Sequence, residues 1–131
     1  MREIVLDTET TGLSWRDAHR LVEIGALELM HHLPTGKRLH IYINPERDID
    51  EGAVAVHGLT NAFLSDKPLF TEIVDEFFSF IGDSPLVIHN ASFDLGFINA
   101  ELDRIQHSLL PMERAIDTLA IARKKFPGAQ A

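Results

Sequence analysis

The stretch IVLDTETTG, residues 4–12, decides how the rest of the sequence is interpreted. It begins with three branched apolar residues, which is typical of a buried strand, and the threonines and glycine at its end indicate a turn. Asp7 and Glu9 lie two positions apart, so on a strand or its extended continuation both carboxylates project to one face. We therefore expect a strand over residues 3–6 that leads directly into a pair of acidic side chains.

This acidic pair has two interpretations. Asp7 and Glu9 can solvate the end of a strand and help to start a turn. They can also hold a cation, because two like charges at this distance repel each other unless a positive ion lies between them. The position after a buried strand favours a ligand site, since open α/β sheets bind ligands outside the carboxyl ends of their strands.

The residues that follow predict a hairpin. Residues 21–30 alternate as a strand does, although several good helix formers near the end of this segment leave a helix open. We favour a strand because Pro34-Thr35-Gly36 then supplies a turn, and apolar residues alternate again over 39–43. Together these segments predict two antiparallel strands.

The remaining chain alternates helices with short strands. Apolar residues at helical spacing predict the helices, and short apolar runs predict the strands. The expected elements are a helix over 71–81, a strand over 86–89, a helix over 93–105, a strand at 115–116 and a helix over 119–125. Asn90 or Ser92 is expected to cap the second of these helices and Asp117 the third. Three leading strands followed by this alternation predict an α/β domain with a mixed sheet.

A third carboxylate, Asp94, follows the second apolar strand of this series. Taken alone, it is an acidic residue in the first turn of a helix, where the helix dipole favours negative charge. If the two strands are neighbours, however, Asp94 can face Asp7 and Glu9. Three oxygen ligands suit Mg²⁺ or Mn²⁺, and two such ions held by carboxylates suit phosphodiester hydrolysis. The combination therefore predicts a metal-dependent hydrolytic site.

Composition agrees with a single domain over residues 1–131. The chain has 45% hydrophobic residues and no cysteine, and a core of this size needs no disulfide. No apolar run approaches the roughly 18 residues that suggest a membrane span, and no signal peptide is visible, so we expect a cytoplasmic protein. The net charge of −8 argues against a broad grip on duplex phosphates. Bound cations can still supply the local positive charge at a few terminal nucleotides.

Several stretches together resemble the proofreading (epsilon) subunits of bacterial DNA polymerase III, which belong to the DEDD exonuclease superfamily (DEDDh type). Residues 4–12 are similar to the first motif of that family, and residues 86–94 are similar to the second. Residues 22–26, 56–59 and 117–123 also fall in the order that the family shows. The resemblance covers essentially the whole chain, and the ordered set is far more specific than any one piece.

The resemblance implies a ribonuclease H-like fold, with a mixed five-stranded sheet of order 3-2-1-4-5 flanked by helices. It implies that Asp7, Glu9 and Asp94 are catalytic residues that bind two divalent ions, Mg²⁺ or Mn²⁺. The implied reaction is removal of the terminal nucleotide from the 3′ end of single-stranded DNA, as proofreading for the replicative polymerase. The implied protein partners are the polymerase III catalytic (alpha) subunit and the other core subunits.

The same resemblance implies the substrate contacts. Asp7, Glu9, Thr10 and His57 would lie against the terminal nucleotide, and Asn90 would help to shape the same pocket. For His57, a buried histidine in a turn is the alternative. In the family, a third motif of histidine followed five residues later by aspartate supplies the general base and the fourth carboxylate.

Two positions depart from the family pattern. The family often carries glutamate five residues before the histidine at position 57, where this chain has Gly52 with Glu51 beside it. After the second motif the only histidine is His107, and Met112 stands five residues beyond it, so the chain contains no general base of the family type. We therefore expect an exonuclease domain that is incomplete at its C-terminal end and weakly active or inactive.

Two other functions remain open at this point. One is a non-catalytic module that binds a polymerase subunit, which would show no dependence on metal ions. The other is an RNA-trimming exonuclease of the same superfamily, because carboxylates alone do not distinguish DNA from RNA. A haloacid-type phosphatase is disfavoured, since it would require aspartate in place of Glu9.

Overall fold

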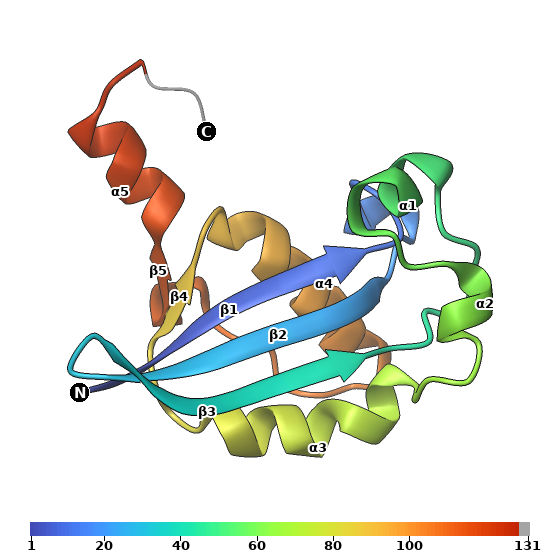
Figure 1. The fold of residues 1–131 in the computed structure, drawn as a ribbon, viewed down its shortest axis with the longest axis horizontal. Coiled ribbons are helices and arrows are strands. Elements are labelled where there is room, and N and C mark those ends of the chain that lie inside the picture. The colour runs from blue at the N-terminus through green and yellow to red at the C-terminus, as the bar shows by residue number, and fades with distance from the viewer. Residues whose placement is uncertain (129–131) are drawn as a thin grey trace.

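In the computed structural model, which describes residues 1–128, a five-stranded mixed sheet forms the centre of the molecule (Figure 1). Its strands are β1 (Arg2–Thr10), β2 (Leu21–Met30), β3 (Leu33–Tyr42), β4 (Leu86–Ile88) and β5 (Ala115–Asp117). Their spatial order is β3-β2-β1-β4-β5. The first three strands pair antiparallel, whereas β4 is parallel to β1 and β5 to β4. The predicted α/β class and strand order are confirmed.

Helices cover one face of the long strands and lie at the ends of the sheet. They are α1 (Glu51–His57), α2 (Asn61–Leu64), α3 (Phe70–Ile81), α4 (Ala91–Arg104) and α5 (Thr118–Lys125), with 3-10 turns η1 (Trp15–Asp17) and η2 (Met112–Arg114). The helices predicted over 71–81, 93–105 and 119–125 are confirmed within two residues at their starts. Figure 1 shows α3 and α4 behind the long strands, with α1 and α2 at one end of the sheet.

Strand β1 is longer than the apolar run in its sequence. It continues through the acidic pair, where Asp7 lies opposite Gly25 and Glu9 opposite Glu23 of β2. The predicted end of the strand at residue 6 is therefore wrong. The alternation of burial persists because Thr8 and Thr10 take the inward positions and are both 6% exposed. Asp7 and Glu9 therefore belong to the part of β1 that pairs with β2.

The hairpin between β2 and β3 turns earlier than predicted. His31 and His32 occupy its two central positions with φ of 53° and 67°, the left-handed conformation that the tight hairpin turn with matching twist requires. Pro34-Thr35-Gly36 lies within β3 instead, where the register against β2 is irregular. Proline is compatible with this place because β3 is the edge strand of the sheet.

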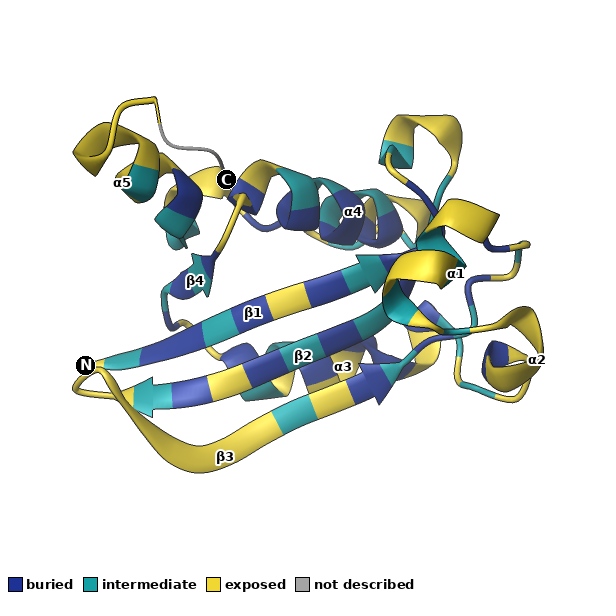
Figure 2. Cartoon of the chain, turned by 45° about the horizontal axis from the view of Figure 1, so that its top comes forward, coloured by how far each residue is buried: buried dark blue, intermediate teal, exposed yellow. Residues whose placement is uncertain are grey.

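The core lies between the sheet and the helices α3 and α4. The most completely buried large side chains include Ile4 and Ile24 of the sheet, Phe77 of α3 and Phe97 of α4. Each Å² of apolar surface removed from water stabilises the fold by about 25 cal/mol, so the burial of such side chains is the main source of stability. Figure 2 shows the buried positions of α4 on the side that faces the sheet. No helix within residues 1–128 has the length and apolarity that crossing a membrane would demand.

A buried ion pair ties α4 to the start of β2. Arg20 donates from Nε and Nη2 to the two carboxylate oxygens of Glu101, at 2.8 and 2.6 Å. The backbone N–H of Leu21 donates to the same carboxylate at 3.1 Å. Because Glu101 is 2% exposed, these three hydrogen bonds satisfy an acid that would otherwise be costly to bury. They fix α4 relative to the strands that bear the acidic pair.

Candidate active site

Asp7 and Glu9 lie on the face of β1 opposite to the inward-facing Thr8. Asp7 is exposed and Glu9 is half-buried. Burial raises the pKa of Glu9 above its usual value, and the negative charge of Asp7 raises it further, while His57 acts in the opposite direction. The two acids therefore share one region of negative potential, as their spacing in the sequence predicts.

Helix α4 brings Asp94 to the same strand. Asn90, with φ of 68°, precedes the helix as its N-cap residue, although its side chain makes no capping hydrogen bond. Asp94 lies in the first turn and is 4% exposed. Its Oδ1 accepts a hydrogen bond of 2.5 Å from the hydroxyl of Thr8. The acid of the second motif is thus fastened to the strand that carries the first.

The pKa of Asp94 reflects its burial and its closeness to Thr8 and Asp7. Burial raises its pKa to about 6, the hydrogen bond from Thr8 opposes this rise, and the charge of Asp7 adds to it. Asp7 therefore influences both of the other carboxylates. A cation bound beside this buried carboxyl group would favour its charged form and lower its pKa.

The donor atoms fit a hard divalent cation. Asp7, Glu9 and Asp94 offer carboxylate oxygens, which Mg²⁺ and Mn²⁺ prefer. Within residues 1–128, no three histidine or acidic side chains lie close enough together to surround an ion. Within the described residues, the three carboxylates share one electrostatic environment but do not form a ready-made cluster around a single ion position.

A pocket of about 400 Å³ opens beside Glu9. This volume falls in the range of small-molecule sites and suits one nucleotide. Thr10 and His57 both line it, whereas Asn90 lines the neighbouring groove instead. The full lining consists of Thr8, Glu9, Thr10, Gly12, Leu13, Asp50, Gly52, Ala53, Val56, His57 and Phe93.

Thr10 and His57 are held in place by hydrogen bonds within the chain. The hydroxyl of Thr10 donates to the carbonyl of Gly12 at 2.6 Å. Nε2 of His57 donates to the carbonyl of Thr10 at 2.9 Å, and Nδ1 accepts from the N–H of Leu59 at 3.0 Å. Both ring nitrogens are therefore in use, and the two hydrogen bonds join α1 to the end of β1. In this structure His57 shapes the pocket wall.

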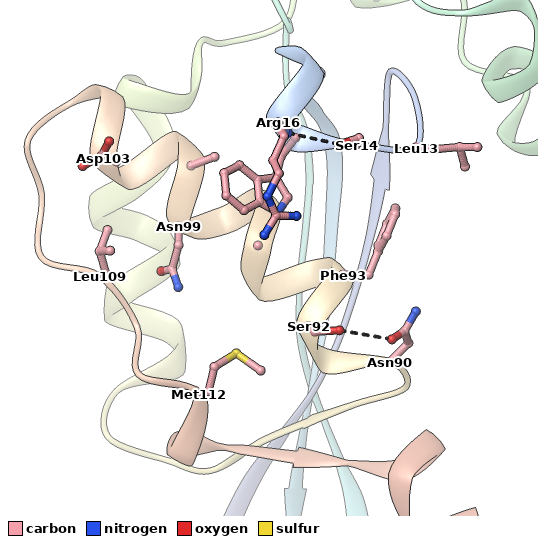
Figure 3. A pocket seen from close by; sticks show the side chains of 13 residues that line it. Leu13, Ser14, Arg16, Asn90, Ser92, Phe93, Asn99, Asp103, Leu109 and Met112 are labelled. Carbon is pink, nitrogen blue, oxygen red and sulfur yellow. Dashed lines mark hydrogen bonds between the residues drawn. The ribbon is translucent and has the colours of Figure 1, made fainter. Parts of the chain in front are cut away.

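Three further residues of the site did not emerge from the sequence. Thr8 holds Asp94, and Leu13 and Phe93 line both the pocket and the groove next to it. The groove has a volume of about 800 Å³ and runs between η1, α4 and the segment before η2 (Figure 3). The available signal was Leu13, an apolar residue in a polar loop that proves to be 89% exposed.

The chain belongs to the exonuclease family, whose sequence profile, described as "Exonuclease", matches residues 4–131. It is similar to DNA polymerase III subunit epsilon of Rickettsia felis, with 53% identity over 133 residues that cover 99% of this chain and 58% of that protein. The same subunit of Salmonella typhimurium is 45% identical over 134 residues, which cover 97% of this chain and 55% of the relative. The chain thus spans less than three fifths of the length of these relatives.

Solved structures agree with the fold. Exonuclease X, in complex with 5′ overhanging duplex DNA, superimposes with a TM-score of 0.75 and 28% identity, covering 98% of this chain and 66% of the other. Exonuclease I without ligand gives a TM-score of 0.83 at 17% identity, covering 98% and 32% of the two chains. The second similarity shows the fold alone.

Proposed function

We propose that this chain forms part of a 3′-to-5′ exonuclease that removes terminal nucleotides from single-stranded DNA 3′ ends and proofreads for a replicative DNA polymerase. The observation that carries the proposal is the hydrogen bond from Thr8 to Asp94. It fastens the third acid to the strand of Asp7 and Glu9, next to a pocket of nucleotide size. The epsilon-subunit relatives support the proofreading role and the partners, which we take to be polymerase III core subunits including the catalytic (alpha) subunit.

Asp7, Glu9 and Asp94 would hold two divalent ions, Mg²⁺ or Mn²⁺. When bound, such ions supply an activated water and stabilise the leaving oxygen of an in-line displacement. The chain itself contributes the pocket, in which Val56 and Phe93 offer apolar surface to a base. With His57 as a fixed wall, the pocket orients the terminal nucleotide beside the acids.

Residues 95–131 contain no histidine followed five residues later by aspartate, and we propose that the general base is supplied by a segment other than these residues. Supporting this, the face of the sheet that bears Asp7 is open, with a hollow of about 340 Å³ lined in part by Leu27, Arg38 and His40. Leu27 is 46% exposed there, and no helix of residues 1–128 covers these strands on the near side in Figure 1.

The test uses a form of the chain extended to the length of the epsilon-subunit relatives, and an oligonucleotide labelled at its 5′ end and scored for stepwise shortening from the 3′ end with Mn²⁺. We expect Asp7→Asn and Asp94→Asn to abolish shortening, and Asp75→Asn, an exposed acid on α3, to leave it unchanged. Equal shortening by wild type and both site variants would refute the proposal. Competition by single-stranded RNA of the same sequence decides the substrate class.

The missing base has its own test. The 131-residue chain should shorten the oligonucleotide far more slowly than a form extended to the length of the epsilon-subunit relatives. Equal rates would show that the base lies within residues 1–131. If the stability of the chain and its affinity for DNA are the same with and without Mn²⁺, the non-catalytic interaction module is supported instead.

A further inference from the structure

We propose that the groove beside α4 binds the nucleotides that precede the 3′ terminus, with Trp15 as a stacking residue and Arg16 as a phosphate contact. The inference rests on the proposed function and adds a second substrate subsite to it. Neither residue belongs to the motifs that resemble the exonuclease family. The groove has about twice the volume of the terminal pocket, which leaves room for about two nucleotides.

The groove and the terminal pocket adjoin each other. Leu13 and Phe93 line both hollows, so they form the ridge between them. A strand whose last nucleotide lies beside Thr10 must therefore cross this ridge or turn directly into solvent. Figure 3 shows Leu13 and Phe93 on one side of the groove and Leu109 on the other. The path across the ridge leads toward η1.

Trp15 has a fixed position along this path. It packs against the main core, and the absence of a side chain at Gly96 lets its indole approach α4 closely. A Cβ at position 96 would come within 2.4 Å of Nε1 and 2.8 Å of Cδ1 of the indole. An aromatic ring held in this way loses little conformational freedom when a base stacks on it. Stacking on aromatic rings is the general means of holding single strands without reading their sequence.

Arg16 supplies the cation that a strand of phosphates requires. Its guanidinium lies over the Trp15 ring, with Cζ 4.3 Å from the ring centroid. It forms no salt bridge within residues 1–128, although the chain as a whole is acidic. A phosphate can therefore draw this exposed cation away without breaking an ion pair, and the ring face beneath it then becomes available to a base.

The far end of the groove sets its limit. Asp103 lies there and would repel a further phosphate. The opposite wall is fixed by two hydrogen bonds. Oδ1 of Asn99 accepts from the N–H of Leu110 at 2.8 Å, and Nδ2 of Asn99 donates to the carbonyl of Leu110 at 3.0 Å. This holds Leu109, 53% exposed, beside the groove as an apolar surface. The groove thus accepts a short strand segment and rejects a longer one.

Intrinsic fluorescence tests the inference directly, because Trp15 is the only tryptophan in the chain. The wild-type chain is titrated with dTMP and with a tetrathymidylate carrying phosphorothioate linkages that resist hydrolysis. We expect the tetranucleotide to quench the emission and dTMP to leave it nearly unchanged. If both ligands bind and the tetranucleotide causes no quenching, Trp15 does not contact the strand and the inference fails.

Variants supply the second readout, the affinity for each ligand by fluorescence anisotropy competition. Trp15→Ala should weaken tetranucleotide binding by about tenfold and leave dTMP binding unchanged, and Trp15→Phe should restore most of the loss. Arg16→Gln should weaken the tetranucleotide alone, whereas Arg123→Gln, an equal charge change on the exposed side of α5, should weaken neither. Unaltered tetranucleotide affinity in both Trp15→Ala and Arg16→Gln would overturn the inference.

The proposed function is tested separately in a form extended to the length of the epsilon-subunit relatives, by hydrolysis with Mn²⁺ of a mononucleotide aryl ester, a substrate that occupies only the terminal pocket. Ester hydrolysis without quenching by the tetranucleotide would overturn the second subsite alone. Absence of hydrolysis and of any nucleotide binding would overturn both. Ester hydrolysis that persists in Trp15→Ala while tetranucleotide affinity falls is the result that we expect.

Discussion

The hydroxyl of Thr8 donates a hydrogen bond of 2.5 Å to Oδ1 of Asp94, a residue 86 positions further along the chain. Both side chains are buried, at 6% and 4% exposure. The contact joins β1 to the first turn of α4 and thereby links the two segments that carry the acidic residues. It also places a carboxylate in an interior where its charged form is disfavoured.

The first prediction follows from that cost. Burial raises the pKa of Asp94 from 3.8 to about 6, so between these values the folded chain binds more protons than the unfolded chain. The free energy of unfolding of the metal-free chain should therefore fall as pH rises from about 4 through 6. Asp94→Asn keeps an oxygen for the Thr8 hydroxyl and removes this loss, so at pH 8 the variant should be more stable by up to about 3 kcal/mol.

Urea unfolding of both chains across pH 4 to 8 measures this effect. Addition of Mn²⁺ at pH 8 should stabilise the wild type and leave Asp94→Asn unchanged. Parallel pH profiles for the two chains would show that Asp94 does not carry the raised pKa. Asp75→Asn, on the exposed face of α3, serves as the matched control.

The second prediction concerns the pair of Arg20 and Glu101. Arg20→Ala leaves a carboxylate that is 2% exposed without its cation, and we expect a loss of about 3–5 kcal/mol in the free energy of unfolding. The double variant Arg20→Met with Glu101→Leu should lose much less, although the N–H of Leu21 then lacks its acceptor. A double variant less stable than Arg20→Ala would contradict this account.

The third prediction concerns Asp117, which confirms its predicted role as a helix cap. Its Oδ1 accepts from the N–H groups of Leu119, Ala120 and Asn90, at 3.0, 3.4 and 3.1 Å. Burial raises the pKa of Asp117, but these backbone donors outweigh it and hold the pKa below the usual value. Asp117→Ala should cost about 1–2 kcal/mol, measured by thermal unfolding at neutral pH.

Asp117→Asn is the control, because it retains an acceptor oxygen and should lose only part of that stability. Since the folded pKa is the lower one, the advantage of the aspartate is present above the unfolded pKa and disappears as pH falls through the folded value. If the wild type is still more stable than Asp117→Asn at pH 2, the difference in stability does not come from the charge of Asp117.

The fourth prediction compares two helical glycines. Gly52 has open space where a Cβ would lie, whereas a Cβ at Gly96 would overlap Trp15. Gly52→Ala should therefore stabilise the chain by about 0.5–1 kcal/mol through improved helix propensity. Gly96→Ala should lose this gain and shift the emission maximum of Trp15 toward that of exposed indole. An unshifted spectrum in the second variant would show that the ring does not lie on α4.

Local patterns determined much of this protein in advance. The alternation of branched apolar residues located the strands, the helical spacing located α3 and α4, and the interval between Asp7 and Glu9 placed both acids on one face. These features depend on repeats of two or of 3.6 residues, which the sequence displays directly. The hairpin turn was the exception, because His31 and His32 adopt left-handed backbone that neither residue type announces.

Only the tertiary structure decided which residues meet. Three contacts join segments that are tens of residues apart. They are the hydrogen bond from Thr8 to Asp94, the ridge formed by Leu13 and Phe93, and the close approach of Trp15 to Gly96. No local period encodes such contacts, because they arise when the sheet and α4 pack together and shape complementarity selects the partners. The sequence by itself therefore determined the elements and the acids, and packing determined the site.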